Sequence, residues 1–207
     1  AQAAAYSGNP VEGLRVATRV GCNGCHGADA GGKVFSEDAE ERIVAPNLTK
    51  RRELYDTVAL EQLLRHGKTH DGHRPLGMPV FMFQNLSDRE IADIDAWLRA
   101  IPKVDNPGLP EKRWSAKTQQ QVADGTYPYD DDLPVPEVLS PKVPPTETLA
   151  LGKHLAMTSC PECHAPDLNG WPGDNAPNLV VAKAYSSEQF ARLMKTGITA
   201  NGTESGS

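Results

Sequence analysis

The sequence predicts an all-α protein in which two versions of one helical domain are joined by a long proline-rich linker. Three observations lead to this prediction: segments with helical spacing and N-terminal caps, an internal repeat, and a run of prolines between the two copies. We place the first domain at residues 1–101, the linker at 102–145 and the second domain at 146–207. We expect the second domain to be incomplete at its C-terminus, because it has no counterpart of the helix predicted over residues 87–101.

The first helix is predicted to begin at Pro10, because Asn9 can cap it and proline is favoured at the first helical position. An apolar stripe at helical spacing follows, formed by Val11, Leu14, Ala17 and Val20. The stripe runs into the sequence CNGCH at residues 22–26, so we expect this helix to deliver Cys22.

Two further helices complete the predicted first domain. Asp56 can cap a helix that Gly67 ends. Ser87 and Glu90 form a capping box at the start of another helix, which Pro102 stops.

The segment from residue 102 to residue 145 holds nine prolines and has no sustained helical or strand period. It cannot form a long helix or a central strand, and we interpret it as an extended linker. A new helix capped by Thr146 then leads to Cys160. His154, on that helix, is interpreted as a solvated or packed helix residue.

All four cysteines of the chain occur in two C-x-x-C-H units. Two thiols at this spacing can each add to a vinyl group on one porphyrin edge, and the histidine that follows then reaches the iron. The sequence therefore predicts two covalently attached haem c groups. The residues of the two units are Cys22, Cys25 and His26 in the first, and Cys160, Cys163 and His164 in the second.

A zinc site and a thiol–disulfide redox site are the two alternatives to haem for these cysteine pairs. Zinc ribbons set their C-x-x-C pairs roughly 15–20 residues apart, whereas Cys22 and Cys160 are 138 positions apart, and zinc leaves the two histidines unexplained. A thioredoxin-like redox motif requires a βαβ pattern, which neither copy shows. Two copies that use every cysteine favour haem, and covalent haem attachment implies a compartment outside the cytoplasm.

The internal repeat extends beyond the cysteines. The sequence VAPNL at 44–48 matches NAPNL at 175–179, and LEQLLRHGKTHDG at 60–72 aligns with FARLMKTGITANG at 190–202. We therefore interpret the chain as two versions of one haem domain.

Composition excludes several classes of function. The net charge is −6 and no segment is basic enough to follow a phosphate backbone, so we expect no nucleic-acid partner. No stretch approaches 18 consecutive apolar residues, so no transmembrane segment is predicted. No signal-peptide pattern is found at the start of the sequence, and the small residues there are typical of a mature exported protein, so we expect an exported protein whose signal peptide is absent or already removed.

Residues 1–101 resemble a class I c-type cytochrome domain, with an N-terminal helix, C-x-x-C-H, PNL, GMPVF and LSDREIADIDAWLRAIP in that order. The whole chain resembles the tandem dihaem cytochromes c that serve as electron-transfer subunits of bacterial periplasmic or membrane-associated dehydrogenases. The resemblance implies two class I cytochrome c domains in the periplasm. It also implies redox partner proteins, with a dehydrogenase as donor, a cytochrome or oxidase as acceptor, and possible assembly into a membrane-associated complex.

The resemblance also implies further haem contacts. The second axial ligand of the first iron falls on Met78, and the carbonyls that accept a hydrogen bond from the proximal imidazoles fall on Pro46 and Pro177. Met82 is a rival for the axial position, although methionine is more often core filler. Three histidines are close enough in sequence to compete as well: His66, His70 and His73.

The second domain has no obvious counterpart of Met78, because the aligned position lies one residue past Ser207. Met194 falls inside a predicted helix and is expected in the core. We expect the native chain to continue beyond Ser207; otherwise the second iron is open. The sequence thus predicts an electron carrier or electron-transfer subunit that is not an enzyme by itself, and the alternative is a dihaem peroxidase-like enzyme that uses an open second haem.

Overall fold

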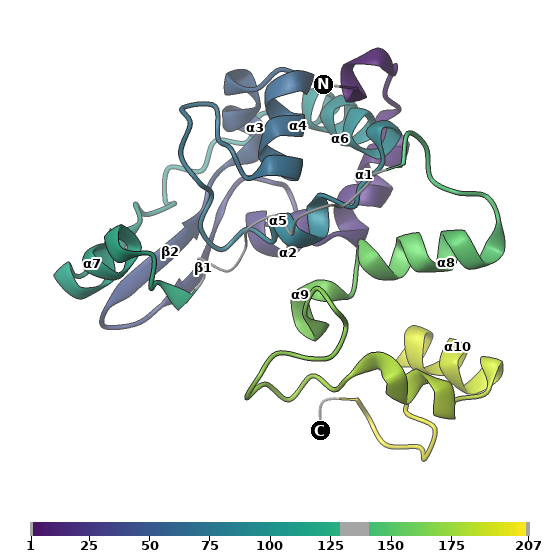
Figure 1. The fold of residues 1–207 in the computed structure, drawn as a ribbon. Helices are drawn as coiled ribbons and strands as arrows, with labels where there is room; N and C mark the ends of the chain where they lie inside the picture. Colours follow the sequence, from purple (N-terminus) through teal and green to yellow (C-terminus); the bar gives the residue numbers. More distant parts are fainter. Residues whose placement is uncertain (1, 129–140, 206–207) are drawn as a thin grey trace. The chain divides into compact units, whose positions relative to one another are not determined.

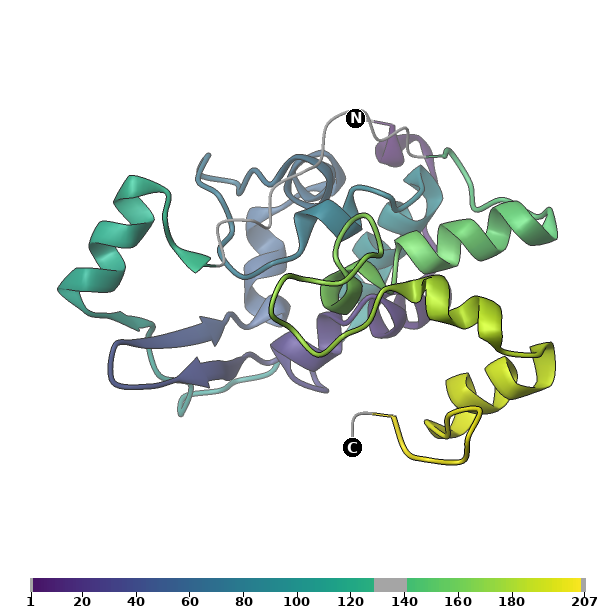
Figure 2. The ribbon, with the colours of Figure 1, turned by 60° about the horizontal axis from the view of Figure 1, so that its bottom comes forward.

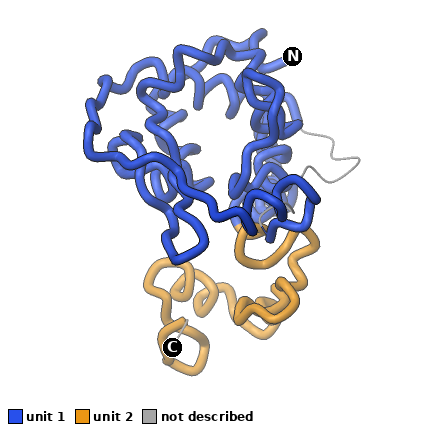
Figure 3. The backbone as a smooth tube through the Cα atoms, turned by 90° about the vertical axis from the view of Figure 1, so that its left-hand side faces the viewer, with its two compact units in different colours: residues 1–159 blue, residues 160–207 orange. Residues whose placement is uncertain are grey.

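The computed structural model describes residues 2–128 and 141–205 (Figure 1). The chain divides into two compact units, residues 1–159 and residues 160–207 (Figure 3). The first unit therefore also contains part of the predicted linker and the helix that precedes Cys160.

The helices of the first unit begin where the sequence provides caps. The Asn9 side chain accepts hydrogen bonds from the first turn of α1, Asp56 caps α4, and Ser87 with Glu90 forms the predicted capping box of α6. These three helix starts are confirmed, and Gly67 ends α4 in the left-handed conformation. The helices are η1 (Ala3–Ala5), α1 (Pro10–Arg19), α2 (Cys22–His26), α3 (Leu48–Arg51), η2 (Arg52–Leu54), α4 (Thr57–His66), α5 (Val80–Phe83), α6 (Asp88–Ala100), α7 (Ala116–Asp124) and α8 (Thr148–Met157).

The core of the first unit lies between α1, α4, α5 and α6. Helix α1 packs along α6, and α4 packs on both α5 and α6. The burial of apolar side chains between these helices is the main favourable contribution to the folding of this unit. The core includes Val16, Ala17, Leu60, Leu64, Phe81, Met82, Leu86, Ile91, Ile94, Trp97 and Leu98.

The packing face of α1 differs from the predicted stripe. Val11 and Leu14 are 74% and 46% exposed, whereas the face that meets α6 is formed by Gly13, Val16, Ala17 and Val20. A Cβ atom on Gly13 would lie 1.9 Å from the carbonyl oxygen of Asp93, so the two helix backbones touch at this glycine. The spacing of apolar residues predicted the helix correctly. It did not predict the face of α1 that packs on α6, because the closest contact on that face is made by a glycine, which an apolar pattern does not include.

The prediction of an all-α chain is wrong, because the first unit contains a small antiparallel sheet in the order β1-β2-β3. β1 (Lys33–Glu37) and β2 (Glu41–Ala45) form a hairpin whose turn is closed by Asp38, which accepts hydrogen bonds from the amides of Glu40 and Glu41. The local signal is present in the sequence as the β-branched and aromatic residues on either side of this turn.

The predicted extended linker is also corrected in part. β3 (Arg113–Trp114) pairs with β2, and α7 follows it with Ser115 as its N-cap and Gly125 as its C-cap. Figures 1 and 2 show α7 beside the β1–β2 hairpin. The physical reason is the distribution of the prolines: none occurs between residues 111 and 127, so this stretch can form regular structure.

The second unit contains α9 (Pro161–His164), η4 (Leu179–Ala184) and α10 (Ser187–Thr196). A capping box of Ser186 and Gln189 starts α10, and Gly197 ends it in the left-handed conformation, as Gly67 ends α4. Met194 is 67% exposed, so the expectation that it lies in a core is wrong. Ahead of this unit, the cap of α8 is Glu147 and not Thr146.

Candidate haem-attachment sites

The first C-x-x-C-H motif forms the short helix α2, which directly follows α1. Gly21 turns the chain between them in the left-handed conformation, with φ 87°. α2 places Cys22 and Cys25 about one helical turn apart, and His26 ends it. The local fold therefore presents two thiols and one imidazole from a single turn, as attachment of one porphyrin edge requires.

The ring of His26 is oriented by a backbone carbonyl. Its Nδ1 lies 2.8 Å from the carbonyl oxygen of Pro46, which can only accept, so Nδ1 carries the hydrogen. Nε2 then has its lone pair available for a metal ion. Burial lowers the pKa of His26 more than the hydrogen bond to Pro46 raises it, which favours the neutral, ligating imidazole.

The second motif has the same arrangement within the second unit. α9 ends at His164, and the Nδ1 of this residue lies 2.7 Å from the carbonyl oxygen of Pro177. Again the acceptor leaves Nε2 as the free ring nitrogen. The structure thus places each motif histidine against the proline that the family resemblance pairs with it.

The backbone after each histidine also repeats. Three residues with positive φ in the first copy have counterparts exactly 138 positions later. The φ values are 87° at Gly27 and 65° at Ala165, 57° at Ala30 and 62° at Leu168, and 90° at Gly32 and 89° at Gly170. The two motifs therefore share one local conformation, although two of the positions differ in residue type.

The hydrogen bonds around this turn repeat as well. The amide of Gly32 donates to the carbonyl of His26 at 2.9 Å, and that of Gly170 to His164 at 2.8 Å. The strand of chain that carries each proline is tied back to the same turn by the amide of the leucine two residues later. These bonds join Leu48 to Ala30 at 2.8 Å and Leu179 to Leu168 at 2.9 Å.

The environment of three of the four cysteines does not favour thiolates. Burial, with a smaller effect from Cys25, raises the pKa of the Cys22 thiol to about 12. Burial likewise raises the pKa values of Cys160 and Cys163. Catalysts of disulfide exchange use thiols with lowered pKa values, so these environments argue against a thioredoxin-like site.

The two candidate methionines of the first unit have different surroundings. Met82 lies in α5 and is 1% exposed within the core. Met78 is half-buried on the loop before α5, between Gly77, with φ 71°, and Pro79. Met82 is therefore accounted for by packing, whereas Met78 as an axial ligand stays a prediction.

The competing histidines lie on the surface. His66, His70 and His73 are exposed. The ring of His70 contacts the ring of Tyr55 edge-on at 5.3 Å, and His73 lies 3.2 Å from Asp71.

A cavity of about 610 Å³ lies beside β2. One side comes from the part of the chain before residue 80, including Val44, Tyr55 and Leu76, and the other side from Lys112, Trp114 and Tyr127 after it. Neither His26 nor Met78 lines this cavity. The side of the cavity formed by Lys112, Trp114 and Tyr127 was not expected from the sequence, because these residues lie in the segment predicted as an extended linker.

Residues 9–98 match a family model described as cytochrome C oxidase, cbb3-type, subunit III. This match supports a c-type cytochrome. The matched cytochrome segment contains the first C-x-x-C-H motif, Pro46 and Met78, and it ends before the second motif. No curated protein matches the chain. No helix in the described part of the chain is long and apolar enough to span a bilayer.

Sequence reasoning did not identify the surroundings of His154. Of the two expectations for His154, solvated or packed, the structure agrees with the packed one: it is 7% exposed, and its Nε2 lies 2.8 Å from a carboxylate oxygen of Glu90. The partner is 64 positions away in the sequence, and no local pattern indicates such a pair.

Proposed function

We propose that the chain is a periplasmic dihaem cytochrome c that carries electrons from a dehydrogenase to a cytochrome or oxidase acceptor. The observation that carries the proposal is the repeated site geometry: each C-x-x-C-H motif has its histidine held by a proline carbonyl with Nε2 available. The family match supports an electron-transfer domain in residues 9–98. The matching model describes an oxidase subunit, which is consistent with a role next to an oxidase.

The residues of each motif have defined roles in this proposal. Each thiol adds across one porphyrin vinyl group: a sulfur–carbon bond forms, and the hydrogen goes to the neighbouring carbon, so no oxidant is needed. His26 and His164 bind the two irons through Nε2, and Pro46 and Pro177 fix the orientation of the rings. When bound, haem supplies a one-electron change between ferric and ferrous iron.

The protein would tune the reduction potential of the first haem through its sixth ligand. Met78 is the proposed sixth ligand of the first iron, where a thioether raises the reduction potential. The location follows from the chemistry, because c-type cytochrome domains are typically extracytoplasmic. The proposed partners are proteins, since electron transfer through a haem edge needs no substrate pocket.

The number of covalent haems tests the proposal most directly. Thioether-linked haem survives denaturation, so the intact mass of the denatured protein is expected to equal the polypeptide plus two haems. Cys160→Ala with Cys163→Ala should remove one haem and leave the other. A wild-type protein that carries a single haem would contradict the dihaem assignment, while the electron-transfer role of the first domain would stand.

Replacement of Met78 tests the axial ligand. Met78→Ala should leave both haems covalently bound, remove the methionine-to-iron charge-transfer absorption and lower one of two midpoint potentials. Optical spectra and a redox titration measure both effects. Met82→Leu is the matched control, because it keeps an apolar side chain of similar size in the core. A Met78→Ala spectrum identical to wild type would refute the ligand assignment.

A further inference from the structure

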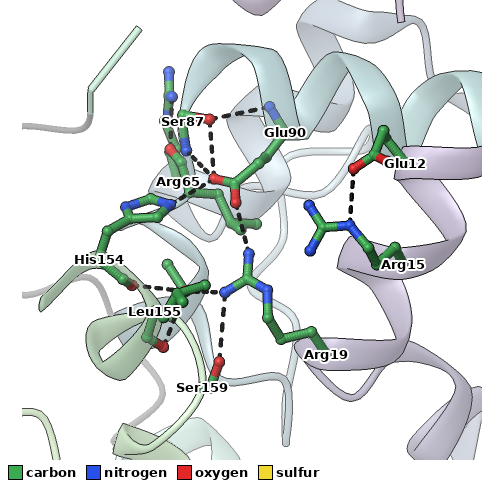
Figure 4. A network of polar contacts seen from close by, with 11 residues as sticks. Glu12, Arg15, Arg19, Arg65, Ser87, Glu90, His154, Leu155 and Ser159 are labelled. Carbon is green, nitrogen blue, oxygen red and sulfur yellow. Dashed lines mark hydrogen bonds and ion pairs between the residues drawn. The ribbon is translucent and has the colours of Figure 1, made fainter. Parts of the chain in front are cut away.

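A buried polar cluster connects three helices of the first unit and is not used by the proposed attachment chemistry (Figure 4). It consists of Arg19 at the end of α1, Glu90 in the first turn of α6 and His154 in α8. Their side chains are 16%, 5% and 6% exposed. Charged groups at this depth are costly unless they are paired, so the cluster must hold together as a set.

Glu90 is the centre of the cluster. Its Oε1 accepts from Nη2 of Arg19 at 2.6 Å, and its Oε2 accepts from Nε2 of His154 at 2.8 Å. The amide and hydroxyl of Ser87 also donate to Oε2, each at 2.9 Å. Burial raises the pKa of Glu90, but the hydrogen bonds and the neighbouring positive charges outweigh it and hold this pKa below its usual value. Glu90 is therefore ionised at neutral pH.

Arg19 connects this carboxylate to the end of α8. Its Nη1 donates to the hydroxyl of Thr158, which is fully buried, and to the hydroxyl of Ser159 at 3.4 Å. Within the described part of the chain, Nε of Arg19 has no hydrogen-bond partner. The positive charge of Arg19 is therefore balanced by its ion pair with Glu90.

Most residues of α8 are exposed or half-buried, and the chain ahead of it is bonded to the start of α6, where the amides of Asp88 and Arg89 donate to the carbonyls of Pro141 and Lys142. His154 is the buried residue of this helix, whereas Leu149 and Leu155 are 81% and 37% exposed. One further bond, from the Asn85 side chain to the carbonyl of Met157 at 3.3 Å, lies at the end of α8. The attachment of α8 within the first unit is therefore mainly polar.

The positions of the cluster along the chain suggest its purpose. Arg19 lies three residues before Cys22, and Ser159 directly precedes Cys160. The cluster thus connects the points at which the chain enters the two C-x-x-C-H motifs. Electron exchange between two centres falls steeply as their separation grows, so control of these entry points matters to a dihaem carrier.

We infer that Arg19, Glu90 and His154 are positioning residues that hold the chain at the entrance of the second C-x-x-C-H motif on the first domain, and thereby control electron exchange between the two haem irons. The inference rests on the proposed dihaem function. Among the described residues, the hydrogen bonds and ion pairs of these three side chains do not reach the cysteines or histidines of the attachment sites, so they act through α8 and the residues that follow it.

The test compares Arg19→Ala and Glu90→Gln with Arg15→Ala in the haem-loaded full chain. Arg15 is a matched control, since it lies on the same helix but pairs with Glu12 on the surface, where the two side chains are 61% and 46% exposed. Glu90→Gln removes the charge, while glutamine can still complete the capping box. Amide hydrogen exchange of residues 148–159 and the rate of interhaem electron exchange are the two measurements.

Both cluster variants are expected to speed hydrogen exchange in residues 148–159 by roughly tenfold or more, because Glu90→Gln removes the charge that pairs with Arg19 and Arg19→Ala removes the side chain that links Glu90 to Thr158 and Ser159. Both should also slow interhaem electron exchange, whereas Arg15→Ala should match wild type in both measurements. If Arg19→Ala does not fold, Glu90→Gln and His154→Gln provide the same comparison.

Unchanged hydrogen exchange in the cluster variants would overturn the positioning role. Faster hydrogen exchange with wild-type electron exchange would overturn the link to the haems. The failure of the dihaem proposal itself would be seen separately, as one haem in the mass of the wild-type protein.

Discussion

Ala165 follows the second motif histidine and has φ 65° and ψ 162°, a backbone region that is essentially reserved for glycine. Its counterpart in the first motif, Gly27, has φ 87° and ψ 153° without such strain. The second motif therefore adopts the conformation of the first at a local cost. That cost is consistent with a conformation required by the site, because the hydrogen bonds around the turn are the same in both copies.

The substitutions Ala165→Gly and Gly27→Ala are expected to change the free energy of unfolding in opposite directions. Ala165→Gly should raise the free energy of unfolding by about 1 kcal/mol, because it relieves the strained backbone at the expense of some unfolded-state entropy. Gly27→Ala should lower it by about 1–3 kcal/mol. Thermal and urea unfolding of the haem-loaded variants measure both. A less stable Ala165→Gly protein would show that the turn is not strained.

At the level of single residues, the sequence was informative where the chemistry is local. The C-x-x-C-H units and the caps at Asn9, Asp56 and Ser87 depend on neighbours within a few positions, so they can be read from the chain. The burial of His154 depends on Glu90, which is distant in the sequence, and no periodic pattern indicates it.

Among the elements, the contact between α1 and α6 depends on one glycine. A Cβ atom on Gly13 would lie 1.9 Å from the carbonyl oxygen of Asp93 and 2.7 Å from Cβ of Trp97. Neither atom can move without a shift of α6 itself. Because α1 continues into the first attachment motif, this close packing also fixes where α2 begins.

Gly13→Ala is therefore expected to lower the free energy of unfolding by about 1–3 kcal/mol or more, as overpacking between backbones requires the helices to separate. Gly152→Ala in α8 is the control, because nothing lies within 4 Å of its added Cβ and alanine favours a helix. Urea unfolding measures both variants. Equal stability of Gly13→Ala and wild type would show that α1 and α6 are not in direct backbone contact.

The hairpin of β1 and β2 shows why a helical pattern alone gave the wrong fold class. Its strands are five residues each and lie between two helical segments, so they contribute little to any long-range period. Their turn at Asp38 and their β-branched residues are short-range signals. Short strands must therefore be predicted from signals over a few residues, and helices from periods over longer stretches of sequence.

For the whole molecule, the repeat in the sequence describes the attachment motifs better than it describes the domains. The two motifs share φ values and hydrogen bonds at an offset of 138 residues. The boundary between the compact units instead falls between Ser159 and Cys160 in the sequence, and the family match covers residues 9–98. The boundaries at 101 and 145 stay predictions, because a repeat identifies equivalent residues and does not determine which helices pack together.

The pairing of β3 with β2 has a practical consequence for dissection of the chain. A fragment that ends at Ile101 would contain every residue of the family match and the first attachment motif, yet it would lack Arg113 and Trp114. The backbone groups of Glu41 and Arg42 that now pair with β3 would then form an open sheet edge, and such edges promote self-association. A soluble single-haem fragment is therefore better ended after Tyr127, whose hydroxyl donates to Glu41 at 2.9 Å.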